Sequence, residues 1–173
     1  MSVFLLVVGI LFSCGAGAWE IKKVDDPMTD KVSEFAAVVS MNGHDFDFPF
    51  NDGKKHAVLA AHRNPGKPER VAIAIMGGMI GCESRTRCKI RCRFDDDSPV
   101  TVVVSMPRSG DWQYAQLLEP FDEMFIILAR KAKRVRIELP IYKNGSRVFE
   151  FDVAGYPYEP VPKKATQKGA KAR

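Results

Sequence analysis

Five basic residues at alternate positions are the side chains with the clearest capacity to bind a ligand. They are Arg85, Arg87, Lys89, Arg91 and Arg93. Successive side chains of a β-strand point to opposite faces, so one strand from about Arg85 to Phe94 places all five on one face, about 6.6 Å apart. This basic ladder is a candidate binding face for an anionic partner, such as a lipid phosphate, a glycan, nucleic acid or an acidic protein.

The basic ladder also has a purely structural interpretation, because like charges at this spacing repel one another unless acids compensate them. Glu138, Glu150 and Asp152 belong to other expected strands and are candidates for cross-strand ion pairs. Residues 19–161 contain equal numbers of basic and acidic residues, which agrees with such pairing. No aromatic residue is interleaved with the ladder, and this disfavours specific binding of single-stranded nucleic acid.

Three cysteines lie close to the ladder, namely Cys82, Cys88 and Cys92. Cys88 and Cys92 fall on one face of the same expected strand, roughly 13 Å apart at about 3.3 Å per residue, which is too far for a disulfide. Cys82 and Cys88 enclose five residues, a loop of the size found in hairpins. We therefore expect a Cys82–Cys88 disulfide and a buried Cys92 thiol. The alternative is a metal site built on the three cysteines. The oxidising compartments that exported proteins reach favour the disulfide.

No other arrangement of residues predicts catalysis, a metal site or a cofactor. The histidines at 44, 56 and 62 lack the spacing of metal ligands, and no Cys-x-x-Cys occurs. Gly77-Gly78 lacks the Lys and Ser/Thr of a phosphate-binding loop, and no Gly-x-Ser-x-Gly sequence is present. We therefore expect a protein that is not an enzyme.

The first 18 residues have the composition of an export signal. They carry no charge, are apolar from Val3 to Phe12 and end in Ala16-Gly17-Ala18. A run this short does not span a bilayer comfortably, so we expect a signal peptide cleaved before Trp19 and a periplasmic or secreted product with no transmembrane span. The alternative is a lipoprotein anchored at Cys14.

The net charge of +5 comes from the C-terminal end. Residues 162–173 contain no acid and five basic residues, which are Lys163, Lys164, Lys168, Lys171 and Arg173. This segment has almost nothing to bury, so we expect a disordered basic tail. Residues 19–161 are long enough for a single domain with its own core.

Alternating and β-branched runs predict that this domain is β-rich. The expected strands cover residues 19–24, 31–41, 56–62, 70–76, 85–94, 100–106, 112–118, 134–141 and a last strand with Phe149, Phe151 and Val153. The predicted fold class is all-β and mainly antiparallel, as a β-sandwich or a strongly curved sheet of about eight strands with one helix near residues 120–131.

Two local features of this fold can be specified further. The helix from Pro120 to about Lys131 should turn one apolar stripe to the core, formed by Phe121, Met124, Phe125, Leu128 and Ala132. It either buries that stripe or leaves an apolar patch for a partner. In the final hairpin, a three-residue loop of residues 143–145 with Gly145 in the left-handed conformation pairs Leu139 with Phe149 and keeps one face apolar.

Several segments resemble a known family. They are Trp19 followed by Asp26-Pro27-Met28-Thr29-Asp30, Gly77-Gly78 with Cys82 and Cys88-x-Ile-x-x-Arg-Phe-Asp-Asp, and residues 145–155. Together they resemble small exported bacterial and phage-borne proteins that are distantly similar to the VasI/TagO-type accessory proteins of type VI secretion. The resemblance implies an envelope-located β-domain and assigns no functional residue. Cys92 and the basic tail are additions to that pattern.

These features predict an exported, non-enzymatic binding or accessory protein of the bacterial envelope. It would present the basic face or an apolar patch to an anionic envelope component or to another protein. The alternative is an enzyme or enzyme inhibitor of the periplasm whose site is built from loops. A histidine facing a carboxylate in a cleft would favour the enzyme, and exposed arginines without ion pairs would favour binding.

Overall fold

A computed structural model describes residues 19–28, 30–84, 86–107 and 112–159. The expected signal peptide, the alternative lipid anchor at Cys14, the basic tail and the ladder residue Arg85 lie outside the described residues.

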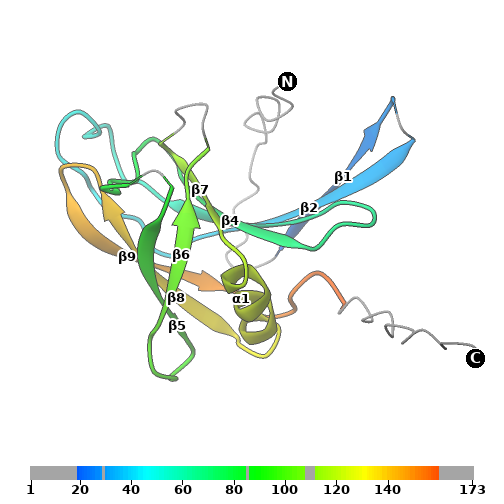
Figure 1. The fold of residues 1–173 in the computed structure, drawn as a ribbon. Helices are drawn as coiled ribbons and strands as arrows, with labels where there is room; N and C mark the ends of the chain where they lie inside the picture. The colour runs from blue at the N-terminus through cyan, green and yellow to red at the C-terminus, as the bar shows by residue number, and fades with distance from the viewer. Residues whose placement is uncertain (1–18, 29, 85, 108–111, 160–173) are drawn as a thin grey trace, which may run out of the picture.

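The described chain forms one sheet of nine strands with a single short helix (Figure 1). The strands are β1 (Glu20–Asp26), β2 (Lys31–Val39), β3 (Ala57–Arg63), β4 (Arg70–Ile75), β5 (Cys88–Phe94), β6 (Val100–Ser105), β7 (Tyr114–Leu117), β8 (Arg134–Ile141) and β9 (Gly145–Asp152), and the helix is α1 (Phe121–Ala129). Their order in the sheet is β1-β2-β3-β4-β7-β6-β5-β8-β9, and every neighbouring pair is antiparallel. The all-β prediction is confirmed, and the architecture is one curved sheet.

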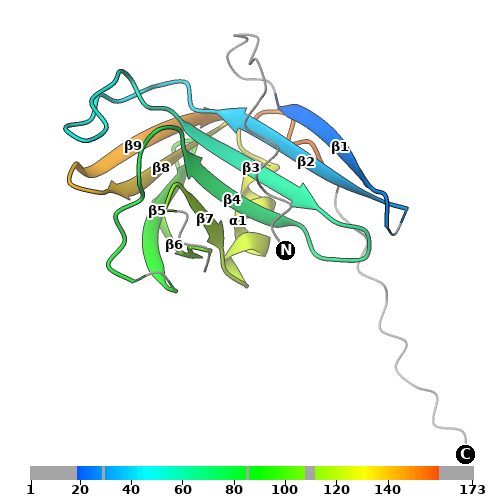
Figure 2. The same cartoon turned by 90° about the horizontal axis from the view of Figure 1, so that it is seen from above.

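The sheet curls until the chain that follows β2 reaches β9 (Figure 2). The Met41 backbone N–H donates to the Glu150 carbonyl over 2.7 Å. The Asn42 side chain accepts from the Glu150 N–H and donates to the Val148 carbonyl, both at 2.8 Å. These bonds satisfy backbone groups that β9 would otherwise expose at the edge of the sheet.

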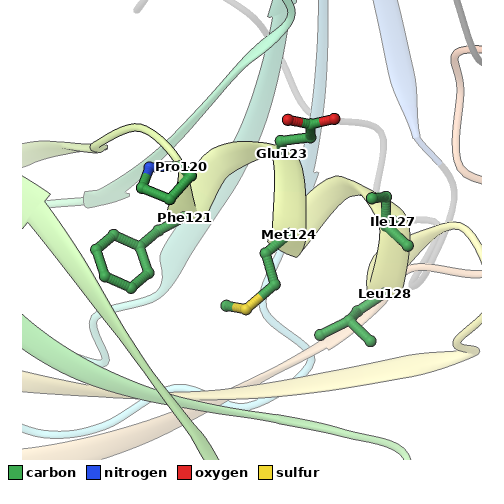
Figure 3. A pocket seen from close by; sticks show the side chains of 6 residues that line it. All are labelled: Pro120, Phe121, Glu123, Met124, Ile127 and Leu128. Carbon is green, nitrogen blue, oxygen red and sulfur yellow. The ribbon is translucent and has the colours of Figure 1, made fainter.

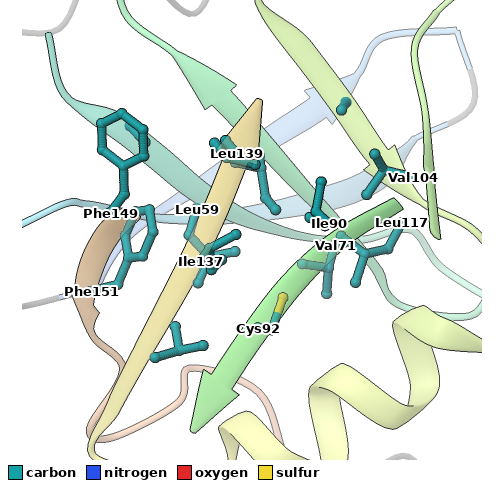
Figure 4. Packing of buried hydrophobic residues seen from close by; sticks show 14 of the residues in the cluster. Leu59, Val71, Ile90, Cys92, Val104, Leu117, Ile137, Leu139, Phe149 and Phe151 are labelled. Atoms are coloured by element: carbon teal, nitrogen blue, oxygen red, sulfur yellow. The ribbon is translucent and has the colours of Figure 1, made fainter. Parts of the chain in front are cut away.

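The core fills the interior of the curl, because each strand alternates buried and outward side chains. Cys88, Ile90, Cys92 and Phe94 of β5 are buried, and so are the core residues of β8 and β9 in Figure 4. α1 lies at one end of the curl, where the fully buried Phe125 ring packs edge-on against Phe94 with 5.1 Å between centroids. Burial of each such aromatic side chain stabilises the fold by about 1.5–3 kcal/mol.

The buried face of α1 includes the predicted stripe and extends beyond it. Phe125 and Ala132 of the stripe are buried, and Phe121, Met124 and Leu128 are partly buried and pack against the core. The helix also buries Asp122, Ile126 and Ala129. Asp122 turns inward because its carboxylate accepts from Arg70 Nη1 at 2.8 Å. A polar residue therefore joins the buried face that hydropathy alone indicates.

The hairpin of β8 and β9 has the predicted loop length but a different register. Ile141 is opposite Gly145, so the loop is residues 142–144, and Ile137 rather than Leu139 lies opposite Phe149. Gly145 has the expected positive φ of 67°. The buried Asn144 fixes the earlier loop, because its Oδ1 accepts from the Asp47 N–H at 2.7 Å. The two-residue shift preserves the parity of the strand, so the apolar face is the predicted one.

Candidate binding face

The disulfide between Cys82 and Cys88 is present in the structure, with 5.6 Å between the two Cα atoms. It closes the loop of residues 83–87, and β5 begins at Cys88 rather than at the predicted Arg85. Cys92 is a buried free cysteine, and burial raises the pKa of its thiol to about 12. It is therefore protonated and unreactive at neutral pH.

Three ladder residues share the outer face of β5, as predicted. Lys89, Arg91 and Arg93 alternate with the buried residues of the strand. Arg87 precedes the strand and is exposed. The regular part of the ladder is therefore shorter than five residues, because the disulfide-closed loop interrupts it.

Neighbouring groups already bind two of these cations. Arg91 lies opposite Glu138 of β8, and its Nε donates to Glu138 Oε2 at 2.6 Å. Arg93 donates from Nε to the Asp97 carbonyl at 2.9 Å and from Nη2 to the Asp96 carbonyl at 3.2 Å. The structural interpretation therefore holds for this half of the ladder.

The adjacent strands β8 and β9 show the same compensation. Arg134 Nη1 and Arg136 Nε contact opposite oxygens of the Glu150 carboxylate at 3.0 and 3.1 Å. Asp152, the third acid expected to pair, instead accepts from the Ala154 N–H at 3.0 Å and joins no ion pair among the described residues. Glu138 and Glu150 are thus the acids that neutralise this part of the sheet.

Arg87 and Lys89 remain, and we call them the basic end of the ladder. Both are exposed, and neither forms an ion pair with any residue that the structure describes. Lys89 faces Val103 across β6, so no acid stands opposite it on that side. An external anion that bound Arg91 or Arg93 would first have to displace the partners of these side chains, whereas Arg87 and Lys89 have no such ion pair to break. This end is therefore the part of the ladder suited to an external anion.

A cavity of about 410 Å³ is connected to the basic end through the Cys82–Cys88 disulfide. Its lining includes Cys82, which the disulfide joins to Cys88, together with Trp112 and the loop residues Tyr142 and Lys143. The Lys143 Nζ lies 5.4 Å from the centre of the Tyr142 ring. One cation, one acid (Glu83) and two aromatic rings therefore border this cavity.

The three histidines take part in other contacts. His44 Nε2 lies 2.8 Å from the Val148 carbonyl, and His56 Nδ1 lies 3.0 Å from the Ser40 carbonyl. His62 stacks on Phe35 with ring centroids 4.2 Å apart. Within the described ranges, no hydrogen bond or ion pair joins any of these histidines to a carboxylate.

Sequence reasoning missed a buried carboxylate at the opposite side of the curl. The Glu69 carboxylate lies 3.2 Å from Arg130 Nη2 and 3.6 Å from Arg63 Nη2, and it accepts from the Tyr156 hydroxyl. Burial, and then the Glu69 charge, raise the pKa of Tyr156, so its hydroxyl remains a donor. No local pattern signals this cluster, because its members are far apart in the sequence.

The same arginines hold the end of the described chain. Arg63 Nη2 donates to the Glu159 carbonyl at 2.8 Å, and Arg130 Nε donates to the Tyr158 carbonyl at 3.1 Å. The Arg63 guanidinium also lies 4.3 Å from the centre of the Tyr158 ring. We call Glu69, Arg63, Arg130 and the tyrosines at 156 and 158 the carboxylate clamp, and its evident role is to fix the C-terminal segment on the sheet.

An apolar groove of about 380 Å³ runs along the outside of α1 (Figure 3). Phe121, Met124, Ile127 and Leu128 line it, with Pro120 and Glu123 at its margin. It contains much of the stripe that the sequence predicts to face the core. Phe121, Met124 and Leu128 also pack against the core, so they are only partly exposed, whereas Ile127 is exposed.

No protein-family model, curated protein or solved structure matches the chain. Across the described residues, no group of three or more His, Cys, Asp or Glu side chains is arranged to hold a metal ion. The described part of the chain also contains no helix with the length and apolar character needed to cross a membrane.

Proposed function

We propose that the protein is an exported, non-enzymatic binding or accessory protein of the bacterial envelope, and that its basic end binds an anionic envelope component. The observation that carries this proposal is the contrast within the ladder. Arg91 and Arg93 are bound within the fold, whereas Arg87 and Lys89 are exposed and form no ion pair with a described residue.

The chemistry of the two side chains suits phosphate, sulfate or carboxylate groups. Arginine presents a planar fork of donors that binds such groups through two hydrogen bonds, and lysine adds a flexible point charge. The Cys82–Cys88 disulfide ties Arg87 to the rim of the neighbouring cavity, which supports a defined site at this end. The disulfide also agrees with an oxidising compartment and thus with export.

The test is charge reversal of the basic end, with vesicles containing phosphatidylglycerol and with immobilised heparin as probes. Each cation near an anionic membrane contributes about 1 kcal/mol, so loss of two weakens vesicle binding roughly thirtyfold, and R87E/K89E should exceed this. The matched control is K131E/K133E, which reverses two exposed lysines at the same spacing after α1. It should weaken binding much less.

Four outcomes separate the possible ligand chemistries from an effect of net charge and from no binding. Loss of vesicle binding alone identifies lipid phosphate as the ligand chemistry, and loss of heparin retention alone identifies an anionic glycan. Equal losses in R87E/K89E and K131E/K133E would show that only net charge matters. Unchanged binding in R87E/K89E would show that the ladder is a solvated face, and the proposal would be abandoned.

A further inference from the structure

The two edge strands of the sheet, β1 and β9, differ in whether other described residues cover their free side. Hydrogen bonds from Met41 and Asn42 cover β9, as described above. Among the described residues, the only strand paired with β1 is β2, and no backbone hydrogen bond reaches the other side of β1. Figures 1 and 2 show β1 and β2 extending past the rest of the curl, with β1 outermost.

The residues of β1 have an unusual order for an open edge. Natural edge strands often carry charges that prevent pairing with another chain. In β1, however, two cations precede Val24 and two acids follow it, in the sequence Glu-Ile-Lys-Lys-Val-Asp-Asp. Ile21 and Val24 are 51% and 41% exposed, so the edge also offers apolar surface.

This order is complementary to itself when the strand is reversed. Two copies that pair through β1 in an antiparallel manner are related by a two-fold axis normal to the sheet. This axis maps each face of the sheet onto the same face of the second copy. Two residues that lie opposite each other across the interface therefore belong to the same face of the sheet. One residue of β1 must then lie on the axis opposite its own copy.

Within β1, an axis at Val24 gives the longest pairing that places no like charges opposite each other. An axis at Ile21 also pairs opposite charges, Glu20 with Lys22, but it joins only residues 20–22 of the two strands. With Lys23 on the axis, two lysines meet and Glu20 lies opposite Asp26 of the second copy. An axis at Lys22 or Asp25 likewise places two like charges together. With Val24 on the axis, residues 22–26 of the two strands pair, and Lys23 lies opposite Asp25, twice by symmetry.

We propose that β1 is a dimerisation edge, at which two copies of this chain join their sheets antiparallel with Val24 on the two-fold axis. Backbone hydrogen bonds across the new strand pair supply the association, as in other strand additions. The two Lys23–Asp25 pairs and the length of the strand pairing select the register. Lys23 is already 3.5 Å from Glu34 on β2, so in the dimer it lies between carboxylates on both sides.

The test measures the self-association of the exported, purified protein by sedimentation equilibrium, from low micromolar to about millimolar concentration. The wild type should dimerise, and salt should weaken the dimer because the charge pairs are exposed. K22D/K23D and D25K/D26K each place like charges across the interface. Each variant alone should therefore have a dimer dissociation constant at least about tenfold larger than that of the wild type.

Mixing the two variants provides the decisive measurement, since the acidic strand of one then matches the basic strand of the other. The mixture should form a heterodimer, whereas K131D/K133D, with the same charge change away from the edge, should dimerise as the wild type does. A wild type that stays monomeric at about millimolar concentration in low salt overturns the proposal. A mixture that fails to associate, or reversal variants that still dimerise like the wild type, also overturns it.

Discussion

Replacement of Glu69 by alanine should remove about 3 kcal/mol from the free energy of unfolding. Only 5% of the Glu69 side chain is exposed, and it faces the guanidinium groups of Arg63 and Arg130. Removal of one partner from a buried ion pair typically costs about 3–5 kcal/mol, because the remaining charge keeps its desolvation penalty. The arginine side chains are 26% and 21% exposed and retain some hydration, so the lower end of that range applies.

Urea unfolding followed by circular dichroism measures this effect at a fixed pH near 7. Glu83→Ala is the matched control, because Glu83 is an exposed glutamate for which a surface change within about 0.5 kcal/mol is expected. Glu69→Gln keeps the shape of the side chain and should lie between the two. A second readout is limited proteolysis, in which Glu69→Ala should expose the segment around Tyr158 to cleavage.

The reasoning would be refuted if Glu69→Ala and Glu83→Ala differed by less than about 1 kcal/mol. The C-terminal segment would then be held by burial of its tyrosine rings, with no net contribution from the carboxylate. An unchanged proteolysis pattern together with a large loss of stability would place the effect in the sheet rather than in the segment.

Four further predictions concern the disulfide, the free cysteine Cys92, His62 and Gly145. The C82S/C88S variant should lose about 2 kcal/mol of unfolding free energy in urea, because the cross-link spans only six positions. The Cys92 thiol should resist a thiol reagent at pH 8 until the protein is unfolded. Burial lowers the pKa of His62 below 6.5 in the fold, so the unfolded chain binds more protons than the folded one near that pH. Thermal stability should therefore fall as the pH drops through 6.5. The fall should be smaller in the His62→Gln variant. Gly145→Ala should cost about 1 kcal/mol in thermal unfolding through its positive φ alone, since an added Cβ meets only one side-chain atom, at 3.8 Å.

Local periodicity was sufficient to predict the strands, because burial on one face imposes an alternation that is visible in the sequence. Its errors have identifiable physical causes. β5 begins three residues late because the Cys82–Cys88 disulfide holds residues 83–87 in a closed loop. The burial of Asp122 on α1 was not predicted, because it depends on Arg70, which is 52 positions away. Contacts of this kind leave no trace in the pattern of a single element.

The same limit applies to the candidate site. The sequence correctly places Lys89, Arg91 and Arg93 on one face and suggests Glu138 and Glu150 as compensating acids. It cannot show which cation each acid neutralises, because this depends on the register between strands that are distant in sequence. The carboxylate clamp was not predictable at all, since Glu69 stands in a loop with no periodic pattern.

The position of a strand in the sheet determines whether its charged side chains can contact a partner outside the fold. β5 has neighbours on both sides, so Arg91 finds Glu138 within the fold and loses its capacity for an external anion. β1 has one neighbour, and Lys23 therefore has Glu34 on one side and no described strand on the other. A charge pattern in a central strand is thus most simply a device of the fold. The edge strand β1 pairs its charges with β2 on one side only, so the same order of charges also faces a second copy on the other side. This is why β1, rather than the longer ladder, is the strand that we propose to specify the register of a second copy.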